Sequence, residues 1–167
     1  MSLLEGKCNV EHAFAYYTFE KSSALQKAIH ALKYKGVQKV GEEFGQIIGS
    51  DLKKSDLYNN IDFIVALPLH KSKKRIRGYN QCDSIAKGIA SAIDAELNLE
   101  IVHRIRATES QTKKSHYDRH TNAEQIFKVK NPEKFANKKV LVIDDVITTG
   151  STLASLIREL NKIENCI

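Results

Sequence analysis

The residues best suited to chemistry follow an apolar run, Val140 to Ile143, in the last third of the sequence. Two adjacent carboxylates, Asp144 and Asp145, come first. A segment of hydroxyl-bearing and small residues follows, made of Thr148, Thr149, Gly150, Ser151 and Thr152. Small residues let successive backbone N–H groups converge on a phosphate, and a helix that starts there adds its positive N-terminal end. Carboxylates repel a phosphate in contact with them. We therefore expect them one ligand-length away, accepting from sugar hydroxyls and holding Mg²⁺ through water.

Two plainer interpretations compete with this one. Thr148 or Thr149 could merely cap a helix, with an acidic pair facing solvent. An Ile-Asp-Asp run also ends strands in response-regulator receivers, where the phosphate is attached to Asp. The hydroxyl-rich continuation with Gly150 disfavours both. No lysine follows Gly150, so the segment is not a Walker A loop.

A second candidate is the strongly basic segment 70–78, which we predict to be a loop after a buried strand. Its five basic residues have no acid between them: Lys71, Lys73, Lys74, Arg75 and Arg77. Like charges on one loop repel one another, so a multivalent anion nearby would relieve them. A small multivalent anion is one candidate. Single-stranded nucleic acid is the other, although only Tyr79 offers a nearby ring for base stacking.

These residues need a scaffold, and the spacing of apolar residues predicts one. Helices are expected over 22–35, 37–48, 81–94 and after residue 152, with a short one at 117–125. Strands are expected over 62–67, 99–105 and 138–143. The alternation predicts an α/β domain with a largely parallel central sheet flanked by helices. In such sheets, ligands bind beyond the carboxyl ends of the strands, where both candidate segments fall.

Composition narrows the class of protein. The chain has 167 residues, 42% hydrophobic and 28% charged, which suits one ordinary domain and excludes general disorder. No apolar stretch approaches the roughly 18 residues that a membrane helix needs. A net charge of +6 agrees with phosphate-bearing ligands or nucleic acid but equally with a solvated surface. Cys8, Cys82 and Cys166 lie far apart, which predicts a reduced, cytoplasmic protein. Oligomeric state is not readable.

Val140-Leu-Val-Ile-Asp-Asp-Val-Ile-Thr-Thr-Gly-Ser-Thr152 resembles the 5-phosphoribosyl-1-pyrophosphate (PRPP) motif of type I phosphoribosyltransferases. Further stretches narrow the match: Leu67-Pro-Leu-His70 with Arg77-Gly-Tyr-Asn-Gln81, Arg106-x-Thr108-x-x-Gln111, Arg119-x-x-Asn122-x-x-x-x-Phe127, and Leu32-Lys-Tyr-Lys-Gly36. Together they resemble the competence protein F (ComF) branch, amidophosphoribosyltransferase-like proteins linked to DNA uptake. The similarity covers roughly residues 19–160.

The resemblance implies a type I phosphoribosyltransferase-like fold with a flexible lid. It also implies Mg²⁺-dependent transfer of phosphoribose from PRPP to a nitrogen acceptor in nucleotide metabolism, with release of pyrophosphate. It assigns the 5-phosphate to Thr148, Thr149, Gly150, Ser151 and Thr152, and pyrophosphate to Pro68, Leu69, His70 and Lys71, often around a cis peptide. The catalytic residues would be Asp144, Asp145, Arg77, Arg106 and Arg119. The lid would carry Thr108, Gln111 and Asn122, and Asp144 and Asp145 would hold the metal indirectly, through water and PRPP.

Two functional classes stay open. The first is an enzyme acting on PRPP or another phosphoribosyl small molecule, with an acceptor that the sequence does not reveal. The second is a non-catalytic DNA-uptake or nucleotide-sensing protein that keeps the PRPP fold and binds single-stranded DNA. Residues 1–18 are expected to be an N-terminal remnant or expression-derived segment. Residues 19–167 would form the phosphoribosyltransferase-like domain, with its terminal strand either missing or disordered. Many members of the branch begin with a four-cysteine zinc ribbon. Only Cys8 is present there, so we expect that module to be absent or to have been cut off.

Overall fold

The computed structural model describes residues 3–18, 23–105 and 126–167. Its centre is a three-stranded parallel sheet in the order β2-β1-β5, formed by Glu96–Asn98, Phe63–Ala66 and Val140–Ile143. Phe63 of β1 lies opposite Glu96 of β2 and Val140 of β5. All four residues of β1 are buried, because a central parallel strand is covered on both faces. The predicted α/β class with a parallel sheet is confirmed.

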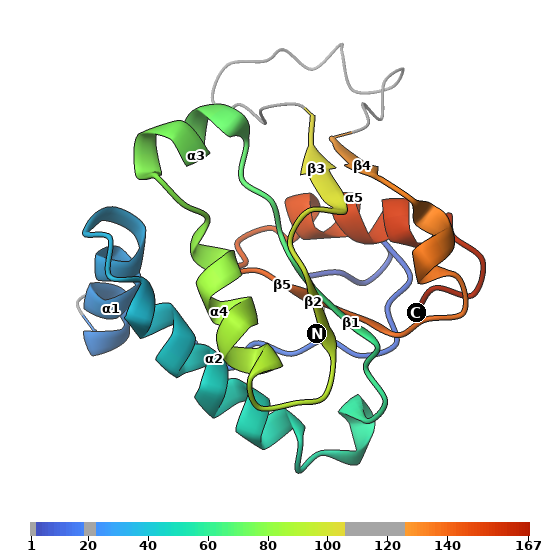
Figure 1. Ribbon diagram of the computed structural model, residues 1–167, viewed down its shortest axis with the longest axis horizontal. Coiled ribbons are helices and arrows are strands. Elements are labelled where there is room, and N and C mark those ends of the chain that lie inside the picture. Colours follow the sequence, from blue (N-terminus) through green and yellow to red (C-terminus); the bar gives the residue numbers. More distant parts are fainter. Residues whose placement is uncertain (1–2, 19–22, 106–125) are drawn as a thin grey trace.

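Helices cover the sheet on two sides. Figure 1 shows α1 (Ala24–Tyr34), α2 (Gln38–Leu52) and α4 (Gln81–Ala90) grouped on one side of the central strands, and α5 (Ser151–Leu160) on the other. Glycines let α2 and α4 approach closely. A Cβ atom at Gly45 would lie 2.1 Å from Ile85 O, and one at Gly88 would lie 2.1 Å from Glu42 O. This tight crossing holds α4 closely against α2.

A second, two-stranded sheet lies beside α5. Strands β3 (Val102–Arg104) and β4 (Phe127–Val129) pair antiparallel, with Val102 opposite Val129. The short 3-10 helix η3 (Pro132–Phe135) follows β4, and Phe127 and Phe135 are fully buried. Another 3-10 helix, η1 (Asp56–Tyr58), leads into β1. This small sheet places Arg104 close enough to Asp144 for their charges to interact.

The segment before α1 has no helix or strand in its described part, yet it packs on the domain. Leu4 is buried, Lys7 Nζ donates to Thr149 O at 2.7 Å, and Arg158 Nη1 donates to Lys7 O at 2.8 Å. At the other end of the chain, Ile167 N–H donates to Lys138 O at 3.0 Å and Val140 N–H donates to Ile167 O at 2.7 Å. The final residue therefore pairs beside the start of β5.

The predicted elements are largely confirmed, with three corrections. The basic segment 70–78 is not a loop: Lys71–Arg77 form helix α3, which His70 caps by accepting Ser72 N–H and which ends at Gly78, with φ +84°. Lysine and arginine are good helix formers, and loop character was inferred from charge alone. The strand expected over 99–105 is shorter, because only β3, Val102–Arg104, falls in that range; β2, Glu96–Asn98, comes just before it and belongs to the other sheet. Helix α4 ends at Ala90, not at residue 94.

Two expectations concern the rest of the chain. The short helix predicted over 117–125 lies outside the described residues. Among the described helices, none has the length and apolar character that crossing a bilayer requires.

Candidate functional site

The carboxyl ends of β1 and β5 lie side by side because the two strands are parallel neighbours. Leu67 N–H donates to Ile143 O at 2.8 Å, so the pairing continues to the last residue of each strand. Asn80 Nδ2 donates to Leu67 O at 3.1 Å and to Asp83 Oδ1 at 2.6 Å. Asn80 also caps α4 by accepting Cys82 N–H. The start of α4 is thereby fastened to the end of β1, and its first residues face those that follow β5.

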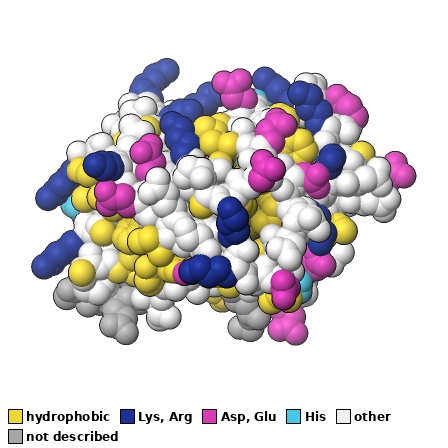
Figure 2. All heavy atoms as spheres, turned by 60° about the horizontal axis from the view of Figure 1, so that its bottom comes forward, with side chains coloured by type: hydrophobic (Ala, Val, Ile, Leu, Met, Phe, Trp, Pro, Cys, Tyr) yellow, Lys and Arg dark blue, Asp and Glu magenta, His cyan; other side chains and the backbone are white. Residues whose placement is uncertain are grey.

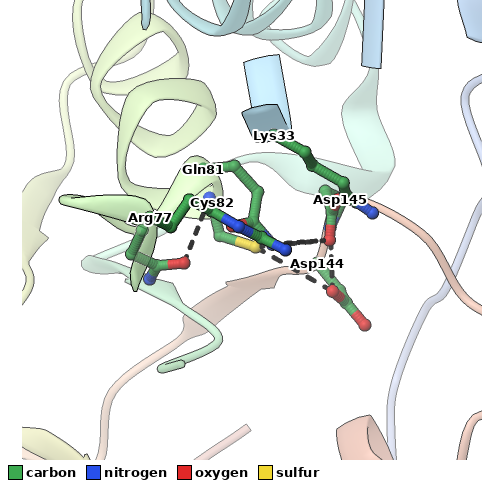
Figure 3. A network of polar contacts seen from close by, with 7 residues as sticks. Lys33, Arg77, Gln81, Cys82, Asp144 and Asp145 are labelled. Carbon is green, nitrogen blue, oxygen red and sulfur yellow. Dashed lines mark hydrogen bonds and ion pairs between the residues drawn. The ribbon is translucent and has the colours of Figure 1, made fainter. Parts of the chain in front are cut away.

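Side chains from two helices hold Asp145 of the carboxylate pair at the end of β5 (Figure 3). Gln81 Nε2, from the first turn of α4, donates to Asp145 Oδ1 at 3.1 Å. Lys33 Nζ, from the last turn of α1, forms an ion pair with Asp145 Oδ2. The side chain of Asp145 is only 6% exposed. Asp144 Oδ1 accepts Asp145 N–H at 2.8 Å, and its carboxylate points away from Lys33 and Gln81.

Burial raises the pKa of two groups in this cluster, Asp144 and Cys82. It raises the pKa of Asp144 to about 7, with a further increase from the charge of Asp145 and a smaller, opposing effect of Lys33. Burial, with both carboxylates adding to it, also raises the pKa of the Cys82 thiol well above its ordinary value. Cys82 is therefore a neutral thiol. A cation or hydroxyl donors arriving beside Asp144 would favour its charged form.

The residues of this cluster can be compared with the ligands that a divalent metal ion prefers. Within the described residues, Cys82, Asp144 and Asp145 form the one group whose ligand atoms lie within 4.8 Å of one another. Carboxylate oxygens suit a hard cation such as Mg²⁺, whereas a thiol binds metal only as the thiolate. The two carboxylates therefore fit such a cation, and Cys82 does not.

The segment after the carboxylates makes fewer contacts with the rest of the described protein than the carboxylates do. The backbone N–H groups of residues 146–150 make no hydrogen bond to any described residue. Thr148, Thr149 and Ser151 are exposed, and Thr149 Oγ1 donates to Ser151 Oγ at 3.1 Å. Gly150 has φ +73°, and a Cβ atom there would lie 2.8 Å from Leu3 O, which explains why glycine stands at this position. Unengaged amides thus precede the first turn of α5.

The predicted pyrophosphate segment, Pro68 to Lys71, connects β1 to α3. Pro68, Leu69 and His70 are partly buried, and Lys71 is exposed. The expected cis peptide is wrong, because no peptide bond among the described residues is cis.

Arg77 joins the carboxylate cluster through Gln81. Its Nη1 donates to Gln81 Oε1, and its guanidinium lies 5.3 Å from the centre of the Tyr34 ring. The other expected members of the site, Arg106, Thr108, Gln111, Arg119 and Asn122, lie outside the described residues.

Sequence reasoning assigned no role to Lys33, Cys82 or Arg104. The guanidinium of Arg104 lies 5.6 Å from the centre of the Phe127 ring. Burial lowers the pKa of Arg104, and the negative charge of Asp144 partly opposes this effect. One signal was present for Lys33: it belongs to the Leu32–Gly36 segment that supported the resemblance. Nothing in that segment indicated which carboxylate it meets.

A parallel sheet that carries a carboxylate pair and a hydroxyl-rich helix start at its carboxyl edge defines a phosphoribosyltransferase-type α/β protein. The chain belongs to the phosphoribosyl transferase domain family, whose family model matches residues 80–167.

Curated relatives place the chain in the ComF-like branch of the type I phosphoribosyltransferases. It is 32% identical over 114 residues to Competence protein F of Haemophilus influenzae, covering 68% of this chain and 50% of that protein. It is 27% identical over 135 residues to the DNA utilization protein YhgH of Escherichia coli K12, covering 79% and 59%. The Salmonella typhimurium protein of the same name is 26% identical over the same length. The chain thus spans between half and three fifths of these relatives. No solved structure matches it significantly.

Proposed function

We propose that this protein binds PRPP and, with Mg²⁺, transfers the phosphoribosyl group to a nitrogen acceptor, releasing pyrophosphate. One observation carries the proposal: backbone amides at residues 146–150, which no described residue engages, adjoin a carboxylate pair whose Asp145 is buried and held by Gln81 and Lys33. The first feature suits the 5-phosphate of a sugar and the second suits its hydroxyls. Membership of the phosphoribosyl transferase domain family supports the same ligand.

The proposed reaction needs little covalent chemistry from the protein. The bond from ribose C1 to the pyrophosphate oxygen breaks, and its electron pair leaves with pyrophosphate. The acceptor nitrogen then bonds to C1 and releases a proton. Positive charge develops on the ribose ring, so Asp144 and Asp145, bound to the ribose hydroxyls, would stabilise the transition state.

Other residues would position the two ends of the substrate. Thr148 to Thr152 would hold the 5-phosphate, and Pro68 to Lys71 with Arg77 would lie along pyrophosphate. Mg²⁺, held through water by Asp144 and Asp145, would supply charge neutralisation of the leaving group. Fixing both ends of PRPP orients C1 toward the acceptor before any bond breaks.

Calorimetry with PRPP and Mg²⁺ tests ligand binding. The wild type should bind, and the double variant Asp144→Asn/Asp145→Asn should lose nearly all affinity while keeping the shape of the side chains. Asp94→Asn is the matched control, because Asp94 lies beyond the end of α4 and away from the site. Equal affinity in the double variant and the wild type would contradict the proposal. Pyrophosphate release with ammonia or a primary amine as acceptor then tests turnover.

A second candidate function is single-stranded DNA binding without turnover. Helix α3 presents four exposed basic residues and Ile76, which is 88% exposed, and the relatives are named for competence and DNA utilization. Against it, basic and acidic side chains are interspersed on the face drawn in Figure 2. A salt titration with an oligonucleotide distinguishes the two. If α3 binds the phosphates of DNA, the double variant Lys73→Gln/Arg75→Gln should reduce the slope of log affinity against log salt concentration by roughly 0.7 per lost phosphate contact.

A further inference from the structure

Helix α1 carries two neighbouring residues with opposite surroundings. Leu32 is fully buried, and a Cβ atom at Gly41 of α2 would lie 3.0 Å from its Cδ1. Lys33 instead extends toward the carboxyl end of β5, where its ammonium pairs with Asp145 and its side chain is 20% exposed. Leu32 anchors the end of α1 on α2, and that anchor places the lysine in the site.

The position of Lys33 is costly unless an anion accompanies it. A largely buried ammonium loses most of its hydration and depends on its ionic partner. Here the partner is Asp145, whose second oxygen already accepts from Gln81. Ribose hydroxyls that bind Asp145 would compete with Lys33 for the same carboxylate. A ligand that displaces Lys33 therefore has to offer it another anion.

The geometry indicates where that anion would lie. Lys33 and Gln81 contact Asp145, and Arg77 donates to Gln81, whereas Asp144 points away from Lys33 and Gln81 (Figure 3). Arg77 belongs to α3, which directly follows the segment proposed for pyrophosphate. The segment proposed for the 5-phosphate has its own nearby cation, Lys7, whose Nζ donates to Thr149 O. Lys33 is thus on the pyrophosphate side of the carboxylates.

We infer that Lys33 is a pyrophosphate-binding residue that exchanges partners: it pairs with Asp145 in the ligand-free protein and with the pyrophosphate of PRPP when the ribose hydroxyls occupy Asp145. The inference rests on the proposed function, because it takes the ribose to bind at Asp144 and Asp145. It adds a third element, α1, to a site otherwise built from the residues that follow β1 and β5.

The wild-type protein itself provides a first test, by reductive methylation of lysines followed by mass spectrometry of the peptides. Ribose 5-phosphate, which has hydroxyls but no pyrophosphate, should release Lys33 from Asp145 and speed its methylation. PRPP with Mg²⁺ should slow it below the rate in the ligand-free protein. The same rate for Lys33 in all three states would overturn the inference. Lys35, which is exposed at the C-cap of the same helix, is the internal reference.

Variants provide a second test. Lys33→Met should weaken binding of Mg²⁺-PRPP and of Mg²⁺-pyrophosphate by roughly 10-fold, the loss of one charge-assisted contact. Ribose 5-phosphate affinity should stay the same or rise, because Asp145 is freed. Lys33→Arg should restore most of the pyrophosphate affinity. Lys35→Met, which removes the same charge two residues away, should change none of the three.

The outcomes separate this inference from the proposed function. If Lys33→Met weakens all three ligands equally, Lys33 is a structural partner of Asp145 and the inference is wrong, while PRPP binding stands. The same holds if Lys33→Met binds PRPP like the wild type. If the wild type binds none of the three ligands, the proposed function fails, and the inference with it. Circular dichroism of each variant confirms the fold, and the methylation test decides if Lys33→Met does not fold.

Discussion

Two neighbouring regions after β5 differ in how many contacts they make with the rest of the protein. Asp145 is buried, and both of its carboxylate oxygens are engaged, by Gln81 and by Lys33. A few residues later, the amides of residues 146–150 make no hydrogen bond to the described part of the chain, and Thr148 is exposed. Side chains from α1 and α4 hold Asp145, whereas the N-terminal segment contacts only the backbone of the following segment, at Thr149 and Gly150, and leaves the side chains of Thr148 and Thr149 exposed. Changes in the first region should therefore affect stability and binding together, and changes to the exposed side chains of the second should affect binding alone.

The largest effect is expected from Asp145→Ala. This change leaves the ammonium of Lys33 without its anion and Gln81 without its acceptor, so it should lower the free energy of unfolding by about 3 kcal/mol. Urea unfolding monitored by circular dichroism measures the change. If the double variant Asp145→Ala/Lys33→Met regains most of the lost stability, the unpaired ammonium of Lys33 causes the loss in the single variant. A loss below about 1 kcal/mol in the single variant would show that the pair is effectively solvated.

The second effect depends on pH. The pKa of Asp144 is raised to about 7 by burial, while an unfolded chain has a value near 3.8. The folded protein therefore binds a proton that the unfolded chain releases, and stability falls as pH rises from about 4 to about 7. Asp144→Asn keeps the oxygen that accepts Asp145 N–H and removes this penalty.

The Asp144→Asn variant should be more stable than the wild type at pH 8 by on the order of 2 kcal/mol, with the difference vanishing near pH 4. Thermal unfolding across this pH range measures it. A difference that does not change with pH would contradict the raised pKa.

A smaller effect is expected at the outer end of the same network. Tyr34 is 66% exposed and contributes to the site by stacking on Arg77. Tyr34→Leu should cost about 0.5 kcal/mol of stability, the usual value of an exposed cation–π contact. PRPP affinity should fall only slightly, because Gln81 still accepts from Arg77. The double variant Tyr34→Leu/Arg77→Met, compared with both single variants, isolates the pairwise energy.

The smallest change in stability is expected in the open segment. Thr148→Ala removes an exposed hydroxyl, so the free energy of unfolding should stay within about 0.5 kcal/mol of the wild type. PRPP affinity should nevertheless fall several-fold, because one donor to the 5-phosphate is lost, and Thr148→Ser should keep it. Calorimetry and urea unfolding on the same samples provide both values. A large loss of stability would mean that this segment is also held by tertiary contacts.

Local patterns predicted much of the fold. The apolar runs around Phe63–Ala66 and Val140–Ile143 predicted two parallel strands, because a strand buried on both faces has no polar alternation. Their carboxyl ends were expected to place Asp144 and Asp145 near the segment after Leu67, and strand pairing does bring them together. Helix α3 was missed, because a run of positive charge was interpreted as an ion-binding loop. Its His70 cap and terminal Gly78 are ordinary helix signals.

The sequence by itself determined which chemical groups follow β5, because strand, carboxylates and glycine-bearing helix start are contiguous and their order alone sets their relative positions. Only the tertiary structure decided that Lys33 of α1 and Gln81 of α4 meet Asp145, and that burial raises the pKa of Asp144. These contacts join segments far apart in the chain, and they depend on the glycine-mediated crossing of α2 and α4. Charge and hydrogen-bond partners inside a protein are set by packing, which no local pattern specifies.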